Sequence, residues 1–222
     1  LVVKADGLAS GKGVFIPETT NECLKATKHI FDGMFGKSGQ IVALEEKIKG
    51  PEVSIFALCD GEKYLLLPTA QDHKRLNEND EGPNTGGMGA YSPTPIVTRD
   101  LLARITKEII KPTIDELRKN NIDYRGVIYF GLMITKSGPK VIEYNCRFGD
   151  PECQTIMPLM DQNFVFLLEK CSMGNLTGDE KISTSDKVSG CVIATSKGYP
   201  HEYKTGFQIK IGKIDSNDCQ IF

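Results

Sequence analysis

Two lysines bracket a glycine-rich stretch near the start of the chain, Lys4 to Gly13 (KADGLASGKG). Glycines let the backbone approach a ligand closely, and successive backbone N–H groups hold phosphate oxygens, to which lysines add positive charge. The spacing is not that of the Walker A loop, G-x-x-x-x-G-K-[ST], because three residues separate Gly7 from Gly11 and a third glycine follows the lysine. An ordinary glycine-rich hairpin with a solvated lysine explains this segment equally well on its own.

A second group of polar residues follows an apolar run in the segment VIEYNCRFGDPE. Because side chains alternate along a strand, Glu143, Asn145 and, if the strand continues, Arg147 share one face. A carboxylate and an amide oxygen are hard ligands suited to Mg²⁺, and arginine is suited to phosphate. The alternative is the polar outer face of an edge strand, which three functional groups in register make less favoured. Asp150 and Glu152 either add metal contacts or cap the following helix.

A long middle segment combines charged residues with glycines. It contains Gln71 to Arg75 (QDHKR) and then Gly82 to Tyr91 (GPNTGGMGAY), and four of the eight residues from Gly82 to Gly89 are glycine. Ordering so many glycines costs much conformational entropy, which predicts a loop that closes on a substrate. His73 alone is better explained as a hydrogen-bonded loop histidine than as a catalytic base.

The charged run Glu45 to Glu52 (EEKIKGPE) lies between two apolar segments. A strand that ends in exposed backbone can pair with an adenine edge, and a carboxylate can accept hydrogen bonds from ribose hydroxyls. On its own, a charged turn is the more economical interpretation of this run.

Composition excludes several classes of protein. The chain has 222 residues, 40% hydrophobic and 25% charged, which is ordinary for a globular protein of one large or two small domains. Net charge is −2, so no basic surface for nucleic acid is indicated. No apolar run approaches the roughly 20 residues that cross a bilayer. The seven cysteines form no C-x-x-C pair, which favours reduced thiols in a cytosolic protein.

The elements that must position these residues follow from apolar patterning and turn signals. We expect a first helix from after Pro17 to about Phe31. A second helix is expected at 98–119, with a kink at Pro112, and a third at 155–171. Strands are expected at 1–4, 14–16, 41–44, 53–58, 64–67, 127–135, 140–144 and 188–195, with further strand character at 220–222.

Residues 71–95 are expected to form a long functional loop without regular structure. Strand pairs mixed with long helices predict an α+β fold with mainly antiparallel sheets. The predicted division is a small subdomain at 1–44, a larger one at 45–186, and the start of an incomplete third domain at 187–222. The first residue is not Met, and the last residues look like strand, so we expect the chain to be a segment of a longer polypeptide.

Four segments in this order resemble the ATP-grasp family and, within it, the glycinamide ribonucleotide synthetases: VVKADGLASGKGV, AQDHKR, GPNTGGMGAYSP and EYNCRFGDPE. The resemblance covers roughly residues 1–206. It implies two α+β subdomains that clamp ATP between antiparallel sheets. It also implies flanking domains, one before this segment and one completed after it.

The resemblance implies a role for each matching residue. For the ATP phosphates it implies Lys4 and Lys12, with Gly11 to Gly13 as a lid. The remaining nucleotide contacts that it implies are an adenine hinge of Glu45, Glu46, Lys47 and Ile48, then Glu52 on the ribose, and Arg75 and Asn84. It assigns Mg²⁺ or Mn²⁺ to Glu143 and Asn145, and a catalytic role at the phosphoryl group to Arg147. The substrate residues that it implies are Asp72, Lys74, Gly86, Gly87, Met88 and Gly89.

The activity implied by the resemblance is the ligation of glycine to 5-phosphoribosylamine with ATP in the cytoplasm, without a nucleic acid or membrane partner. Two residues depart from the family's pattern. Lys47 replaces a usually apolar hinge residue, and Pro51 replaces a usual glutamate, which stiffens the turn before Glu52 and removes one charge. Two other interpretations stay open at this point. The chain is another ATP-grasp ligase, such as a carboxylase or an amino-acid ligase, or it is a nucleotide-binding module without turnover.

Overall fold

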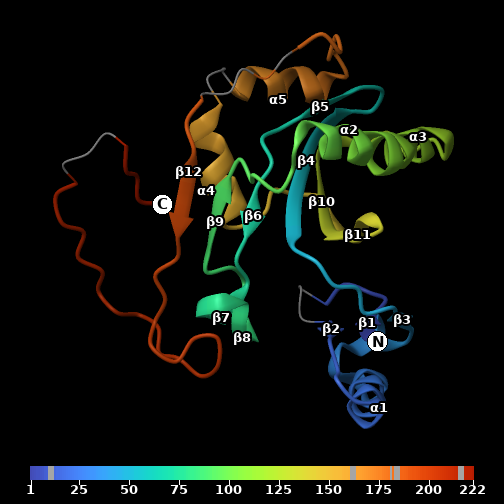
Figure 1. The fold of residues 1–222 in the computed structure, drawn as a ribbon, viewed down its shortest axis with the longest axis vertical. Helices are drawn as coiled ribbons and strands as arrows, with labels where there is room; N and C mark the ends of the chain where they lie inside the picture. Colours follow the sequence, from blue (N-terminus) through green and yellow to red (C-terminus); the bar gives the residue numbers. More distant parts are fainter. Residues whose placement is uncertain (10–12, 161–163, 181, 183–185, 215–217) are drawn as a thin grey trace. The chain divides into compact units, whose positions relative to one another are not determined.

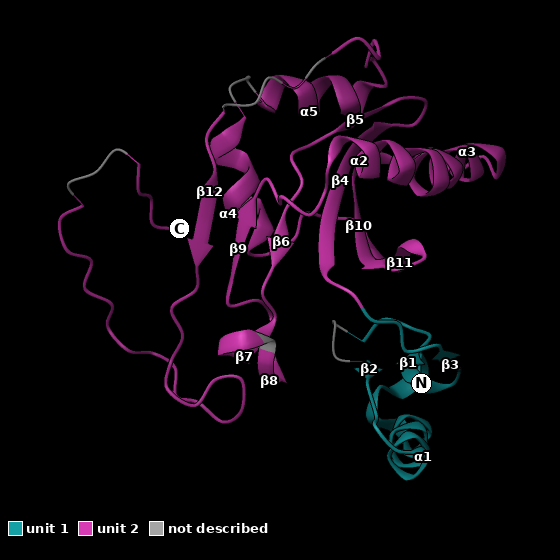
Figure 2. Cartoon of the chain, in the orientation of Figure 1, with its two compact units in different colours: residues 1–49 teal, residues 50–222 magenta. Residues whose placement is uncertain are grey.

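The computed structural model describes residues 1–9, 13–160, 164–180, 182, 186–214 and 218–222. These residues form two compact units, Leu1–Lys49 and Gly50–Phe222 (Figure 2). The three-part division expected from the sequence stays a prediction.

Unit 1 is a three-stranded antiparallel sheet with one helix against it (Figure 1). Its sheet has the order β2-β1-β3, and helix α1 is followed by two short irregular helical turns, η1 and η2. Their bounds are β1 Val2–Ala5, β2 Val14–Phe15, α1 Thr20–His29, η1 Ile30–Met34, η2 Gly36–Gly39 and β3 Val42–Glu45. Thr19 caps α1 by accepting a hydrogen bond from the Glu22 N–H. Val3, Ala26 and Ile30 form the small core.

The main sheet of unit 2 has four antiparallel strands in the order β11-β10-β4-β5. Their bounds are β4 Glu52–Asp60, β5 Tyr64–Leu66, β10 Arg125–Thr135 and β11 Gly138–Asn145. Strand β4 is buried from its second residue to its last. A strand that is apolar on both faces requires a covering layer on each side of the sheet.

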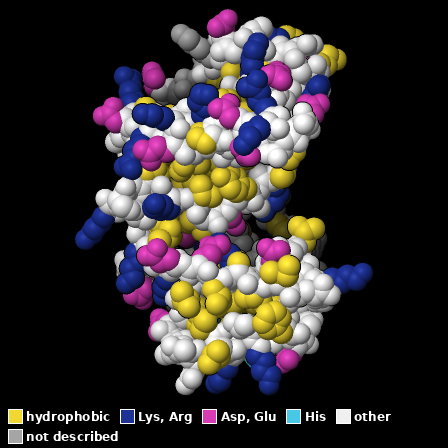
Figure 3. All heavy atoms as spheres, turned by 90° about the vertical axis from the view of Figure 1, so that its right-hand side faces the viewer, with side chains coloured by type: hydrophobic (Ala, Val, Ile, Leu, Met, Phe, Trp, Pro, Cys, Tyr) yellow, Lys and Arg dark blue, Asp and Glu magenta, His cyan; other side chains and the backbone are white. Residues whose placement is uncertain are grey.

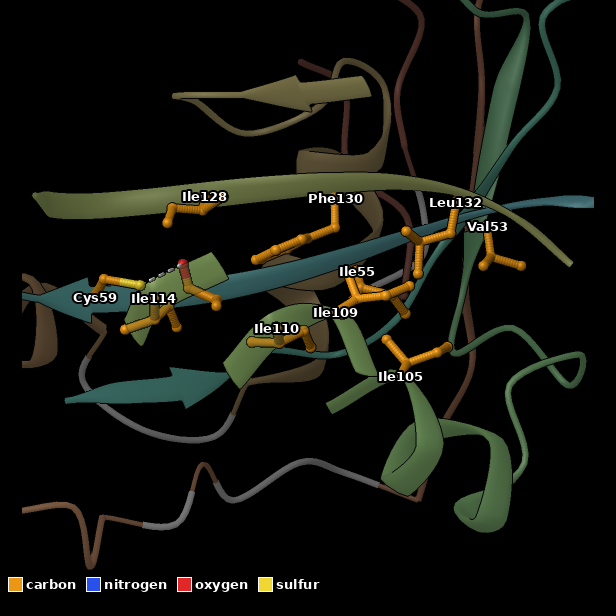
Figure 4. Close-up of a cluster of buried hydrophobic side chains, with 11 residues drawn as sticks. Val53, Ile55, Cys59, Ile105, Ile109, Ile110, Ile114, Ile128, Phe130 and Leu132 are labelled. Carbon is orange, nitrogen blue, oxygen red and sulfur yellow. Dashed lines mark hydrogen bonds between the residues drawn. The ribbon is translucent and has the colours of Figure 1, made fainter. Parts of the chain in front are cut away.

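One layer consists of α2 (Arg99–Ile105), the π-helical turn η4 (Thr106–Ile110) and α3 (Lys111–Lys119). Figure 4 shows isoleucines from this layer directed at side chains of β4 and β10. Pro112 lies in the first turn of α3, where its missing N–H breaks no hydrogen bond of that helix. The helix predicted at 98–119 is therefore present as three consecutive helical segments, with the irregular turn placed before the proline.

The opposite face of the sheet is covered by α4 (Glu152–Ile156), the turn η5 (Met157–Leu159) and α5 (Phe164–Met173). Phe56 of β4 and Tyr129 of β10 belong to this second core, with an edge-to-face ring contact at 5.2 Å. The single helix predicted at 155–171 is thus two helices with a turn between them. Pro158 lies in that turn, and proline has no N–H to continue a helix.

The prediction that residues 71–95 lack regular structure is wrong. They contain a two-stranded hairpin, β7-β8, and two strands of a further sheet with the order β12-β9-β6. The bounds are β6 Gln71–Asp72, β7 Arg75–Asn77, η3 Glu78–Asp80, β8 Glu81–Asn84, β9 Gly89–Ser92 and β12 Ser189–Val192. These strands have two to four residues, which is too short for apolar patterning to reveal, and β9 also pairs with β12, about 100 residues away in sequence. The strand character expected at 220–222 is absent from the described residues there.

Candidate functional site

The register of the main sheet gathers polar side chains on the face that α4 and α5 cover. Gly131 of β10 pairs with Ser54 on one side and with Glu143 on the other, and Tyr129 pairs with Asn145. Directly paired residues point to the same face of a sheet, so Glu143 and Asn145 share a face with Ser54. The intervening Tyr144 points to the other face, where its ring contacts Phe130 at 5.5 Å.

Lys74 lies among carboxylates on this face. Its Nζ is 3.2 Å from Glu52 Oε2 and 3.8 Å from Glu143 Oε1. Burial by itself lowers the pKa of Lys74, but the negative charges of Glu52 and other neighbours outweigh it and raise the pKa above its ordinary value. Lys74 and Glu143, assigned separately from two distant motifs, therefore lie in one cluster.

A small cavity of about 10 Å³ lies inside this cluster, roughly the room that one water molecule needs. It is lined by Glu52, Ser54, Asp72, Lys74, Tyr129 and Glu143, with four apolar or glycine neighbours between them. Asn145 does not line the cavity, although it follows Glu143 on the same face.

Beneath the cluster is a buried hydrogen-bonded network. Ser54 Oγ donates to Glu152 Oε1 at 2.9 Å and lies 3.0 Å from the Tyr129 hydroxyl. Glu152 is 2% exposed and begins α4, and Gly149 leaves room for its carboxylate, since a Cβ at that glycine would overlap the Glu152 oxygens. Burial, and then the Glu152 charge, raise the pKa of Tyr129.

Asp72, on β6, lines the cavity with a carboxyl group whose pKa is strongly raised. Burial, and secondly the charge of Glu152, raise the pKa of Asp72 to about 7. Its Oδ1 is buried and accepts no hydrogen bond from any residue that the structure describes. A Cβ on Gly87 would lie 2.9 Å from that oxygen, so the glycine-rich loop passes directly over it.

The N–H groups of the glycine-rich loop already have protein acceptors. Gly86 N–H donates to the Tyr199 hydroxyl at 2.9 Å, Gly87 N–H to Thr85 Oγ1 at 3.0 Å, and Met88 N–H to the His73 carbonyl at 2.8 Å. In this conformation the loop does not offer consecutive free N–H groups to an anion. The loop instead brings its backbone close to Asp72, because its glycines carry no side chains.

Other predicted residues have partners outside the cluster or lie in unit 1. Arg75 and Asn84 are cross-strand partners in the β7-β8 hairpin, and Arg75 Nη1 donates to the Gly82 carbonyl at 2.6 Å. Arg147 lies beyond the end of β11 and donates to the Phe148 carbonyl. In unit 1, Lys4 Nζ is 2.7 Å from Glu45 Oε2.

The predicted hinge, Glu46, Lys47 and Ile48, follows β3 as irregular chain, with only Ile48 partly buried. Gly13 is buried beside Ala5 and Ala9, at the end of the predicted lid. Gly11 and Lys12 lie outside the described residues.

The donor set of Glu143 and Asn145 fits Mg²⁺, because Mg²⁺ takes one or two protein oxygens and completes its shell with water and substrate phosphates. Within the described ranges, no group of three or more His, Cys, Asp or Glu side chains forms a metal site. A metal here would therefore depend on nucleotide phosphates for its remaining ligands.

Sequence patterns did not identify Ser54, Tyr129 or Tyr199. Ser54 and Tyr129 lie inside strongly apolar strands, and the only signal was a hydroxyl in each run. Tyr199 lies outside all four motifs, and its hydrogen bond to Gly86 connects it to them.

A larger groove of about 640 Å³ lies beside α3, with Tyr124, Ile128, Tyr144 and Cys146 among its lining residues. Figure 3 shows apolar side chains gathered on this face of unit 2. Asn145 also borders this groove. No described helix combines the length and the apolar character that a membrane crossing requires.

Comparison with known families gives one match, over residues 1–153, to the phosphoribosylglycinamide synthetase ATP-grasp (A) domain. A phosphoribosylamine–glycine ligase of Caldanaerobacter subterraneus is 50% identical over 215 residues, covering 95% of this chain and 50% of that protein. A trifunctional purine biosynthetic protein of Gallus gallus is 47% identical over 94% of this chain and 21% of its own length.

Solved structures give the same relationship. The phosphoribosylamine–glycine ligase of Thermotoga maritima superposes with a TM-score of 0.81 at 32% identity, over 91% of this chain and 51% of that one. A biotin carboxylase of Campylobacter jejuni, solved with an ATP analogue, has a TM-score of 0.63 at 17% identity, which shows a shared fold alone. The predicted α+β ATP-grasp fold is confirmed. The chain spans about half the length of the first of these ligases.

Proposed function

Because the chain belongs to the phosphoribosylglycinamide synthetase ATP-grasp (A) domain family, we propose that it serves the ATP-dependent ligation of glycine to 5-phosphoribosylamine in the cytoplasm. The observation that carries this proposal is the cluster of Lys74 with Glu52 and Glu143 on one face of the main sheet. Such a cluster supplies both an anion-binding cation and a metal-binding carboxylate. Its remaining partners, in this proposal, are the flanking domains of a longer polypeptide.

The proposed reaction has two steps. A carboxylate oxygen of glycine attacks the γ-phosphorus of ATP, the bond to the β–γ bridging oxygen breaks, and ADP leaves. The amine nitrogen of 5-phosphoribosylamine then attacks the carbonyl carbon of glycyl phosphate and loses a proton, and inorganic phosphate leaves. No protein nucleophile is required, so the chain's residues bind, orient and neutralise charge.

Residues of the cluster and its cavity, together with Asn145 and Arg147, have proposed parts in this reaction. Glu143 and Asn145 hold the divalent cation, which when bound would neutralise charge on the phosphate oxygens. Lys74 and Arg147 bind anionic groups of the nucleotide or the glycyl phosphate. Asp72 lies under the glycine-rich loop, where a substrate amine would meet its carboxyl group.

The nucleotide contacts are proposed from the family motifs. They comprise the phosphate-binding residues Lys4, Gly11, Lys12 and Gly13, the hinge Glu45 to Ile48, Glu52 for the ribose, and Arg75 with Asn84. The substrate loop is proposed to be Gly86, Gly87, Met88 and Gly89. Its backbone N–H groups at 86–88 already donate within the protein, so substrate contacts would use carbonyl oxygens and the close approach that glycines allow.

The test is ADP release by the 222-residue chain with MgATP, with and without glycine and 5-phosphoribosylamine. Release that requires both substrates supports the proposal and shows that this chain suffices. Nucleotide binding without release in any mixture would instead indicate a nucleotide-binding module. Release with other carboxylate and amine pairs, but not with these two, would assign the chain to another ATP-grasp ligase. A Glu143→Ala variant serves as the control for metal-dependent release.

A further inference from the structure

Tyr199 connects the C-terminal part of unit 2 with the glycine-rich loop. Its hydroxyl accepts a hydrogen bond from the Gly86 N–H at 2.9 Å, across more than one hundred residues of sequence. The tyrosine itself is held in place, because its N–H donates to the Ser196 carbonyl at 3.1 Å and its ring packs edge-to-face on Tyr203 at 5.5 Å. The Tyr199 hydroxyl is thus a fixed hydrogen-bond acceptor for the N–H of Gly86, the first glycine of the Gly86–Met88 loop.

The other end of the loop is held by the strand that precedes Tyr199. Ile193 N–H donates to the Met88 carbonyl at 3.0 Å, and Val192 of β12 pairs with Gly89 of β9. A Cβ on Gly89 would lie 2.5 Å from the Cys191 carbonyl oxygen, so the two backbones meet without side chains between them. Residues 191–199 therefore hold the loop at both ends.

We propose that Tyr199 is a positioning residue for substrate binding: its hydroxyl fixes the Gly86–Met88 loop in the conformation that receives the ligation substrates. This proposal rests on the function proposed above. Glycines have many accessible backbone conformations, so a loop of this composition needs external contacts to stay in one of them. The affinity of a ligand that requires the ordered loop is its intrinsic affinity multiplied by the fraction of time that the loop is ordered.

The contacts of the Tyr199 hydroxyl differ from those of the cluster. The hydroxyl accepts from the Gly86 N–H, whereas Lys74 of the cluster pairs with Glu52 and Glu143. Loss of the hydroxyl is therefore expected to weaken binding of the ligation product and to leave MgATP affinity unchanged. One neutral hydrogen bond of ordinary strength corresponds to about a fivefold change.

The experiment compares Tyr199→Phe with Tyr203→Phe in the 222-residue chain. Both changes remove one hydroxyl and keep the ring, and Tyr203 is 46% exposed. The probes are glycinamide ribonucleotide, the stable product of the proposed reaction, and MgATP, each titrated by calorimetry. Amide hydrogen exchange at Gly86 reports the loop directly. Only Tyr199→Phe should speed Gly86 exchange, by about fivefold, and weaken product binding, by up to about fivefold, at unchanged MgATP affinity.

Each other result overturns the proposal in a recognisable way. Faster Gly86 exchange with unchanged product affinity would give Tyr199 a merely structural role. Equal losses in Tyr199→Phe and Tyr203→Phe would assign the effect to the packed rings and not to the hydroxyl. A wild-type chain that binds MgATP but not the product would contradict the proposed function itself, and the role of Tyr199 in substrate binding would fall with it.

Discussion

Replacing Asp72 with asparagine should stabilise the fold at high pH far more than at low pH. In the folded chain burial and the charge of Glu152 raise the pKa of Asp72 to about 7, against an ordinary value of 3.8. Below pH 3.8 the carboxyl group is protonated in both the folded and the unfolded chain and contributes nothing. Between these two pKa values only the unfolded chain releases the proton, so the free energy of unfolding falls as pH rises.

The size of the effect follows from the pKa difference. Each pH unit between the two values costs about 1.36 kcal/mol, which gives about 4 kcal/mol once the pH exceeds 7. Asparagine removes the ionisation and therefore the cost. The stability gain of Asp72→Asn should grow from about 1 kcal/mol at pH 4.5 to about 4 kcal/mol at pH 8.

Urea denaturation at pH 4.5 and pH 8 measures this difference. The chain has no tryptophan, so circular dichroism or tyrosine fluorescence provides the signal. Asp186→Asn, at an exposed position, controls for the loss of one negative charge. A gain for Asp72→Asn that is the same at both pH values would refute the reasoning, because it would show that the folded chain does not retain the Asp72 proton.

Three further predictions concern the same site. Ser54→Ala leaves the buried Glu152 carboxylate without its donor and should lower the free energy of unfolding by about 1–3 kcal/mol in urea titrations; an unchanged midpoint would contradict the network. Gly87→Ala, at φ +121°, should cost at least about 1–3 kcal/mol, whereas Gly212→Ala, with open space around it, should be near neutral by the same assay. Glu143→Ala should abolish the Mg²⁺ dependence of ATP affinity at unchanged stability; a variant that keeps this dependence in calorimetry would exclude Glu143 as the metal ligand.

The long strands of unit 2 were predictable because their signals are local. The runs at 53–58 and 127–135 are almost continuously apolar, and the turn at Ser137–Gly138 connects β10 to β11 directly. Strands β6 and β9 were not predictable, because they are short and β9 needs β12, whose sequence lies about 100 residues away. The glycines and prolines of the segment around them are typical of loops, so local patterns do not distinguish these strands from loop.

The candidate site also has a part that local patterns predict and a part that they do not. Strand alternation placed Glu143 and Asn145 on one face, since that argument needs only neighbouring residues. The contact of Lys74 with Glu143 depends on β6, which Lys74 follows closely, lying beside β4, and no local pattern specifies that arrangement. Ser54, Tyr129 and Glu152 meet because of the sheet register and the position of α4, so their network could be found only in three dimensions.

The pairing of β9 with β12 has a consequence for the order in which the chain is made. Gly89 leaves the ribosome roughly 100 residues before its partner Val192, which at about 5–20 residues per second is a delay of about 5–20 seconds. During that interval β9 has β6 on one side and an unpaired edge on the other, and such edges invite pairing with other chains. The glycine-rich loop is therefore expected to be among the last parts of unit 2 to reach its final shape, because β12 is synthesised long after the residues of the loop.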